Sequence, residues 1–113
     1  MIEDTVIDHL KAHLDVPVSA QRPSGPPASF VVVRKSGSDE NNTLCAANIT
    51  VYSHAPTPWQ TMTLNKQVKA AMALLRDESP NVFACRCTTD YDSPDTRYKE
   101  PRYAAVFKVT YLD

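Results

Sequence analysis

Hydrophobic periodicity divides the chain into helical and extended segments. Residues 2–14 carry apolar side chains at the three-to-four-residue spacing of an amphipathic helix. The apolar positions of this stripe are Ile2, Val6, Leu10 and Leu14. The helix is expected to stop before Pro17, because the residue before a proline is disfavoured in the α conformation. A short strand is predicted at Val16–Ala20, followed by a stiff proline-rich connector over 22–27.

The middle of the chain predicts two strands. Phe30–Arg34 is a continuous run of apolar residues before its final arginine, which is typical of a strand buried on both faces near the middle of a sheet. Lys35–Asn42 contains no apolar residue and is expected to form a solvated loop. Thr43–Ser53 then alternates apolar and polar residues, which predicts a strand with one buried and one wetter face.

Three signals for a helix start coincide after this strand. Thr57 is the predicted N-cap, Pro58 occupies the first helical position, and Gln60 the third. The helix is expected to run to about Leu75, with one apolar side formed by Leu64, Val68, Ala71, Met72 and Leu75. A second apolar side consists of Trp59, Met62, Ala70 and Leu74. A helix with two apolar sides needs two partners, so this side is expected to contact another subunit or loops of the same chain.

The last third predicts two strands joined by a long polar loop. Asn81–Asp90 is expected to place Phe83, Cys85 and Cys87 on one face of a strand. Arg102–Leu112 is the final strand, and its predicted core face consists of Tyr103, Ala105, Phe107, Val109 and Tyr111. The loop between them, Tyr91–Pro101, exceeds the usual length of a hairpin connection, which indicates a surface used for contact.

The order of these elements, α-β-β-β-α-β-β, predicts an α+β fold. We expect a two-layer sandwich in which a mixed, mostly antiparallel sheet carries the two helices on one face. The length of 113 residues suits a single domain spanning 1–113.

Composition narrows the possible functions. With only 2 glycines, the chain has no Gly-rich loop to cradle a nucleotide phosphate. The formal net charge of −1 and the lack of a long basic run argue against sequence recognition of nucleic acid and against binding to anionic membranes. The N-terminal residues do not resemble a signal peptide, and no apolar run is long enough to span a membrane.

Candidate catalytic or metal-binding groups are sparse. Cys45, Cys85 and Cys87 are interpreted as small buried hydrophobic residues, and a thiol- or metal-dependent enzyme is the alternative. His9 and His13 are four residues apart on the first helix and could share a metal, but no glutamate of the HExxH type lies between them and His13 falls near the apolar stripe, which favours a half-buried or solvated pair. We therefore expect no catalytic residues, no metal site and no cofactor.

The polar loops are the stronger candidates for function. Around the long loop, acidic and basic residues are balanced and tyrosines are frequent, a composition that suits the rim of a protein interface. The candidate interaction residues are Asp39, Glu40, Tyr91, Asp95, Arg97, Tyr98 and Arg102. A loop that is merely solvated remains the alternative.

Taken together, these segments resemble the tail terminator, or head-to-tail joining, proteins of long-tailed bacteriophages and prophages. The resemblance covers nearly the whole chain, from the N-terminal helix to the last alternating strand. It rests on the order and spacing of Val16-Pro17-Val18, the proline-rich turn into Phe30–Arg34, the Gly-bearing polar loop, Ile49-Thr50-Val51-Tyr52, the long helix, Tyr91–Asp95 and Glu100–Tyr103.

This resemblance implies a structural virion protein without catalytic activity. The expected assembly is a homo-oligomeric ring, six subunits being typical of the family, that stops polymerisation of the tail tube and joins the tail to the head. Its expected partners are further copies of itself, the tail tube protein and the head connector protein, with assembly in the cytoplasm of a bacterial host. A head-completion or minor tail protein of the same module is the nearest alternative.

Overall fold

The computed structural model describes residues 1–41 and 44–112, without the side chains of 39–41. Its elements are α1 (Ile2–His13), β1 (Val18–Ser19), β2 (Phe30–Asn41), β3 (Leu44–His54), α2 (Pro58–Met72), α3 (Leu75–Glu78), β4 (Val82–Asp92) and β5 (Arg102–Leu112). The predicted order is confirmed, and the one-turn helix α3 is an addition to it.

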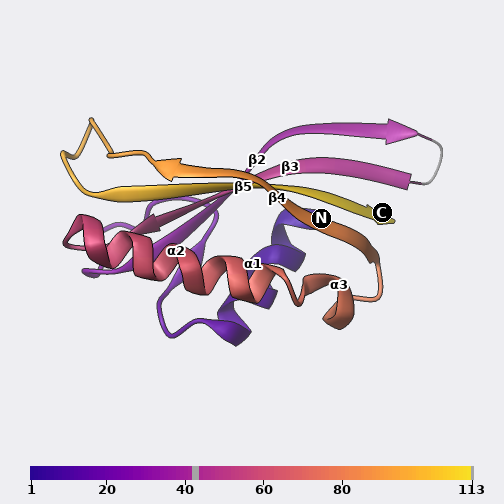
Figure 1. The fold of residues 1–113 in the computed structure, drawn as a ribbon, viewed down its shortest axis with the longest axis horizontal. Coiled ribbons are helices and arrows are strands. Elements are labelled where there is room, and N and C mark those ends of the chain that lie inside the picture. Colours follow the sequence, from indigo (N-terminus) through magenta and orange to yellow (C-terminus); the bar gives the residue numbers. More distant parts are fainter. Residues whose placement is uncertain (42–43, 113) are drawn as a thin grey trace.

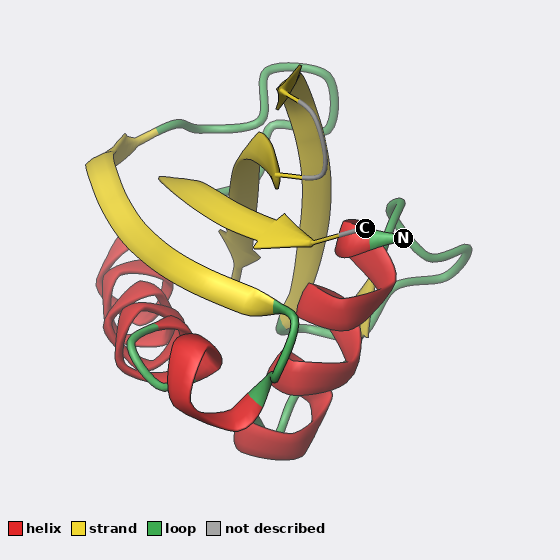
Figure 2. Ribbon diagram, turned by 90° about the vertical axis from the view of Figure 1, so that its right-hand side faces the viewer, coloured by secondary structure: helices red, strands yellow, loops and turns green. Residues whose placement is uncertain are grey.

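The strands form one sheet in the order β1-β2-β3-β5-β4. β1 pairs with β2 in parallel, and every other pair is antiparallel. All three helices lie on the same face of this sheet (Figure 1), which curves around them when seen from the side (Figure 2). The predicted α+β sandwich with a mixed, mostly antiparallel sheet is therefore confirmed.

The core lies between the helices and the concave face of the sheet. Leu10 of α1 and Val68 of α2 belong to this core. From the sheet, β2, β3 and β5 contribute Val31, Ile49 and Phe107, and all five side chains are buried. Burial of apolar side chains of this size supplies most of the favourable free energy of folding. None of the helices in the described ranges has the length and hydropathy needed to cross a membrane.

The predicted start of α2 is confirmed. The backbone N–H of Gln60 donates to Oγ1 of Thr57 at 3.2 Å, and Pro58 is the first helical residue. The helix ends at Met72, earlier than the predicted end near Leu75, because the chain turns at 73–74. This turn starts α3 with Leu75 fully buried in the core.

The predicted loop at Lys35–Asn42 is wrong for its described part. β2 continues to Asn41 and pairs with β3 as far as Leu44, with a shift in register between Lys35 and Gly37. The ends of β2 and β3 extend beyond the helices (Figure 1), although Cys45 and Ala47 of β3 still belong to the buried core. Ser36 and Ser38 of β2 are exposed, so this part of the strand lacks the apolar alternation on which a sequence prediction depends.

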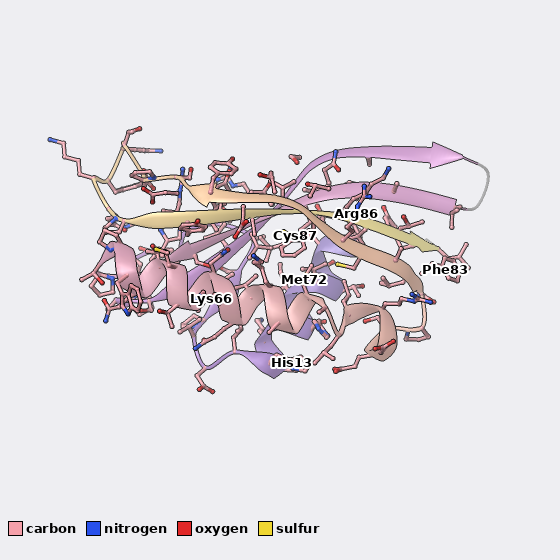
Figure 3. All side chains as sticks on the ribbon, in the orientation of Figure 1. His13, Lys66, Met72, Phe83, Arg86 and Cys87 are labelled. Atoms are coloured by element: carbon pink, nitrogen blue, oxygen red, sulfur yellow. The ribbon has the colours of Figure 1, made fainter. Side chains whose placement is uncertain are left out.

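The predicted faces of β4 are wrong at its start. A register shift between Val82 and Ala84 turns Val82 and Cys85 toward the core and leaves Phe83 47% exposed. Phe83 lies near the start of β4 and is labelled in Figure 3. Cys87 is also exposed, so the prediction of three buried cysteines is wrong for this residue. All three cysteines are free thiols, and burial together with the neighbouring Cys87 raises the pKa of Cys85 to about 11.

Candidate functional site

The connection between β4 and β5 spans residues 93–101, so the predicted loop Tyr91–Pro101 is confirmed except at Tyr91 and Asp92, and backbone hydrogen bonds close it into a turn. β4 itself continues to Asp92, and beyond it the N–H of Ser93 donates to the carbonyl of Arg102 at 3.0 Å. Asp95 and Glu100 exchange backbone hydrogen bonds of 2.9 and 3.1 Å. Residues 96–99 form the tip, because the backbone hydrogen bonds at Ser93, Asp95 and Glu100 continue the hairpin beyond the two strands.

Asp95 organises this tip. Its Oδ1 accepts the backbone N–H groups of Arg97 at 3.0 Å and Tyr98 at 3.2 Å, an arrangement typical of Asp in turns. Lys99 completes the reversal with a φ of 53°. Burial disfavours the charged carboxylate, but the two N–H groups and the nearby Arg102 outweigh this effect and lower the pKa of Asp95.

Arg22 of the connector holds the turn from one side. Its guanidinium binds both carboxylate oxygens of Glu100, with Nη1 to Oε2 at 3.0 Å. The same guanidinium lies 3.9 Å from the centre of the Tyr98 ring and 5.4 Å from that of Phe30. The hydrogen-bonded pair raises the pKa of Arg22 and lowers that of Glu100, so both groups stay charged over a wide pH range.

Arg102, the first residue of β5, holds the turn from the other side. Its Nε donates to the carbonyl of Ser93 at 2.8 Å, and Nη2 donates to the Ser93 hydroxyl at 3.2 Å. Nη1 lies 3.8 Å from the Asp95 carboxylate, and the guanidinium sits 4.4 Å from the centre of the Tyr52 ring. The turn is thereby fixed against the face of the sheet that the helices do not cover.

These groups enclose a pocket of about 270 Å³. Its lining consists of Arg22, Val32, Arg34, Tyr52, His54, Asp95, Arg97, Tyr98 and Arg102, and we call it the arginine pocket. The connector, β2, β3, the turn and the start of β5 all contribute side chains. Residues far apart in the sequence therefore meet at one end of the sheet.

His54 lies at the base of the arginine pocket. The side chain stacks on Phe30 with ring centres 4.2 Å apart, and the residue is only 4% exposed. Its Nδ1 has no hydrogen-bond partner among the described residues. Burial, together with the positive charge of Arg102, lowers the pKa of His54 to about 4, so the ring is neutral near pH 7.

The arginine pocket carries an excess of positive charge. Four arginines and one aspartate line it, and among the described residues Arg34 and Arg97 form no ion pair. Guanidinium groups of this kind bind carboxylates through paired hydrogen bonds, and the tyrosine rings add apolar contact area. The pocket is thus chemically suited to an acidic group presented by another molecule.

A second exposed surface lies on the outer side of α2. Trp59 is 74% exposed, Met62 and Leu74 are each 41% exposed, and Ala70 is also exposed. Polar residues such as Lys66, labelled on α2 in Figure 3, are interspersed among them. We call the four apolar residues the α2 surface.

The α2 surface is adjacent to the open edge of the sheet. Asp90 of β4 accepts hydrogen bonds from Asn65 at 3.0 Å and from Lys69 at 3.1 Å, both on α2. The hydrogen bond with Asp90 raises the pKa of Lys69, and the two contacts link the helix to the last strand of the sheet. β4 is an edge strand, so its outer backbone groups are not paired within the sheet.

Comparison with solved structures finds chains of similar fold. No protein-family model matches the chain, and no curated protein matches it. A solved structure, described as the virion of native gene transfer agent (GTA) particle, contains a similar chain. The two are 16% identical with a TM-score of 0.56, over 99% of this chain and 95% of the other. The two chains share a fold.

The structure brings four of the predicted interaction residues together in the arginine pocket: Asp95, Arg97, Tyr98 and Arg102. Tyr91 lies outside its lining, exposed on β4 opposite Ala104. Asp39 and Glu40 belong to β2, and their side chains lie outside the described residues.

Sequence reasoning missed Arg22, Tyr52 and His54. Arg22 meets Glu100 across 78 residues of sequence, and no local pattern reports such a contact. Tyr52 and His54 lie two residues apart at the end of β3 and therefore share a face of the strand. The sequence prediction placed Tyr52 on the wetter face. The only local signal for His54 is that this polar residue continues the alternation of the strand.

Proposed function

We propose that this protein is a structural component of a phage-like particle. It forms a homo-oligomeric ring, of the sixfold type implied by the sequence resemblance, at the end of the tail tube. The observation that carries the proposal is the end-to-end fold likeness to a chain of a gene transfer agent virion, which covers 99% of this chain. The resemblance of the sequence to tail terminator proteins points to the same kind of particle.

The α2 surface and the edge of β4 are the proposed contact between neighbouring subunits. Exposed Trp59 and Met62 supply apolar area, and tryptophan is the side chain most enriched among residues that dominate binding energy. β4 offers an open edge of 11 residues, which natural proteins usually cover or blunt. A contact between this surface and a different surface of the next copy repeats around an axis and closes into a ring.

The β4–β5 turn and the described ends of β2 and β3 are the proposed contacts along the axis of the tail. They lie at opposite ends of the longest dimension of the molecule, which measures 42 Å (Figure 1). The arginine pocket at the β4–β5 end would receive an acidic group of the tail tube protein, and the β2–β3 end, with Asp39 and Glu40, would face the head connector protein. Ring and connector would then join tail to head in the virion.

A structural role without catalysis is part of this proposal. The lining of the arginine pocket contains charge-binding and aromatic groups but no cysteine, serine or lysine. The raised pKa of Cys85 keeps this thiol protonated near pH 7, which disfavours it as a nucleophile. No cofactor is needed for assembly of this kind.

Two pairs of substitutions test the proposed contacts separately. Trp59→Lys with Met62→Lys should convert the ring to monomers in native mass spectrometry and light scattering, because charges would then face an apolar partner surface. Arg34→Glu with Arg97→Glu should leave the ring intact but prevent it from capping purified tail tubes. Both pairs change exposed side chains that make no ion pair among the described residues, so circular dichroism should remain unchanged.

The outcome also separates the proposal from its nearest alternative. A wild-type protein that stays monomeric up to high micromolar concentration and binds no tail tube would refute the ring. Binding to heads that contain a portal, without binding to tubes, would instead identify a head-completion protein. Tube capping that survives reversal of both arginines would remove the arginine pocket from the axial contact.

A further inference from the structure

The helical layer contains a cluster of metal-ligating groups that the proposed function does not use. His9 and His13 lie one turn apart on α1, and Glu78 is the last residue of α3. One ligand atom from each of these three residues lies within 4.8 Å of the others. His13 is labelled in Figure 3 on the side of the helical layer away from the sheet.

Hydrogen bonding determines which nitrogen of His9 is available. Its Nε2 lies 2.6 Å from the carbonyl oxygen of Ala71, which can only accept a hydrogen bond. Nε2 therefore carries the proton, and in the neutral ring Nδ1 presents its lone pair. A histidine that donates its other ring N–H to a backbone carbonyl is the usual arrangement for a metal ligand, because this contact fixes the ring and raises its basicity.

The lone pair of His9 faces a negative charge. Nδ1 lies 3.8 Å from Oε1 of Glu78, and the same oxygen lies 2.7 Å from Nε2 of His13. A nitrogen lone pair and a carboxylate oxygen repel each other unless a cation lies between them. His9 is 7% exposed, so solvent screens this repulsion poorly, whereas His13 and Glu78 are open to an arriving ion.

The geometry points to a divalent transition-metal site, with zinc as the best fit, formed by His9 Nδ1, His13 Nε2 and Glu78 Oε1. Two imidazoles and one carboxylate are a frequent zinc ligand set, and a fourth position is left for water. Binding requires the proton between His13 and Glu78 to leave and the three groups to close by small side-chain movements. The site would fasten α1 to α3, which are separated by more than 60 residues of sequence.

A direct test measures zinc binding by the full-length chain after removal of metal with a chelator. Titration calorimetry with Zn²⁺ in the presence of a phosphine reductant should give one ion per chain. Glu78→Gln and His13→Gln should each weaken binding at least about tenfold, because each removes one ligand. Both residues are exposed, so these variants should fold, which near-ultraviolet circular dichroism can verify. His9 is left unchanged because it is buried against Ala71.

Two matched controls locate the ion. Asp77→Asn alters the adjacent exposed acid of α3, and Cys87→Ser removes the exposed thiol, so both variants should bind zinc like the wild type. Nitrogen-15 spectra of the histidine rings should show His9 coordinated through Nδ1 with its Nε2 proton retained. No binding by the wild type at about 100 µM Zn²⁺, or binding that Glu78→Gln and His13→Gln leave unchanged, would overturn the site. Loss of binding in Cys87→Ser would assign the ion to the thiols and equally overturn it. None of these measurements depends on ring formation.

Discussion

Acidification should destabilise the protein through His54. The pKa of this histidine is 6.5 when unperturbed, as in the unfolded chain, and about 4 in the folded protein, where burial and Arg102 disfavour the charged ring. The unfolded chain therefore binds a proton at pH 5 that the folded protein does not bind, and stability falls as the pH drops. The loss begins near pH 6.5 and is complete near pH 4.

The size of this effect follows from the two pKa values. One pH unit corresponds to about 1.4 kcal/mol, so the free energy of unfolding should be about 2 kcal/mol lower at pH 5 than at pH 7 because of His54 alone. Asp95 and Glu100 contribute little over this interval, because their lowered pKa values keep them charged in the folded protein. Most of their contribution is lost at lower pH.

A comparison with His54→Phe isolates the effect. The new ring keeps the stack on Phe30 and removes a buried nitrogen that has no partner, so the variant should be at least as stable as the wild type at pH 7. Urea unfolding of both proteins at pH 5, 6 and 7 should show the wild type losing about 2 kcal/mol more than the variant. His9 and His13 are present in both proteins and cancel. Equal losses would refute the assigned pKa of His54.

Five further substitutions test the packing and the local contacts, each by urea unfolding at pH 7. Phe107→Ala should cost about 3–5 kcal/mol, because this side chain is buried in the core, whereas Phe83→Ala, on an exposed bulge, should cost less than about 1 kcal/mol. Thr57→Ala should cost about 1 kcal/mol by removing the N-cap of α2, and Thr63→Ala in the same helix should be neutral or slightly stabilising. Glu100→Gln should cost about 1 kcal/mol by weakening its paired hydrogen bonds, and a change within error would contradict the observed geometry.

Local signals in the sequence predict most of the elements. The start of α2 depends on Thr57, Pro58 and Gln60 within a single turn, and the last strand alternates between buried and more exposed residues from Ala105 to Leu112. Both patterns are physical requirements of the element itself. The two-layer arrangement follows, because a sheet and helices with one apolar face each must cover one another.

Elements that bury no apolar face leave no such pattern in the sequence, so they are not predicted. Residues 36–41 form a strand because they pair with β3, yet Ser36 and Ser38 are exposed and carry no apolar alternation. The register shift that exposes Phe83 likewise depends on pairing with β5 rather than on the sequence of β4. The arginine pocket depends on contacts between segments up to 78 residues apart, which no local pattern records.

Polar contacts have a particular importance for the N-terminal segment. Before β2 the chain contributes only two residues to the sheet, at Val18 and Ser19, so its backbone is poorly anchored. Burial of α1 fixes the middle of this segment, while Arg22 binds Glu100 at one end of the molecule and His13 binds Glu78 at the other. Arg22 also lines the arginine pocket, so an acidic group that enters the pocket would compete with Glu100 for its guanidinium. Docking at this end would therefore change the anchoring of the connector before it affected the sheet, whose long strands are paired independently of the segment.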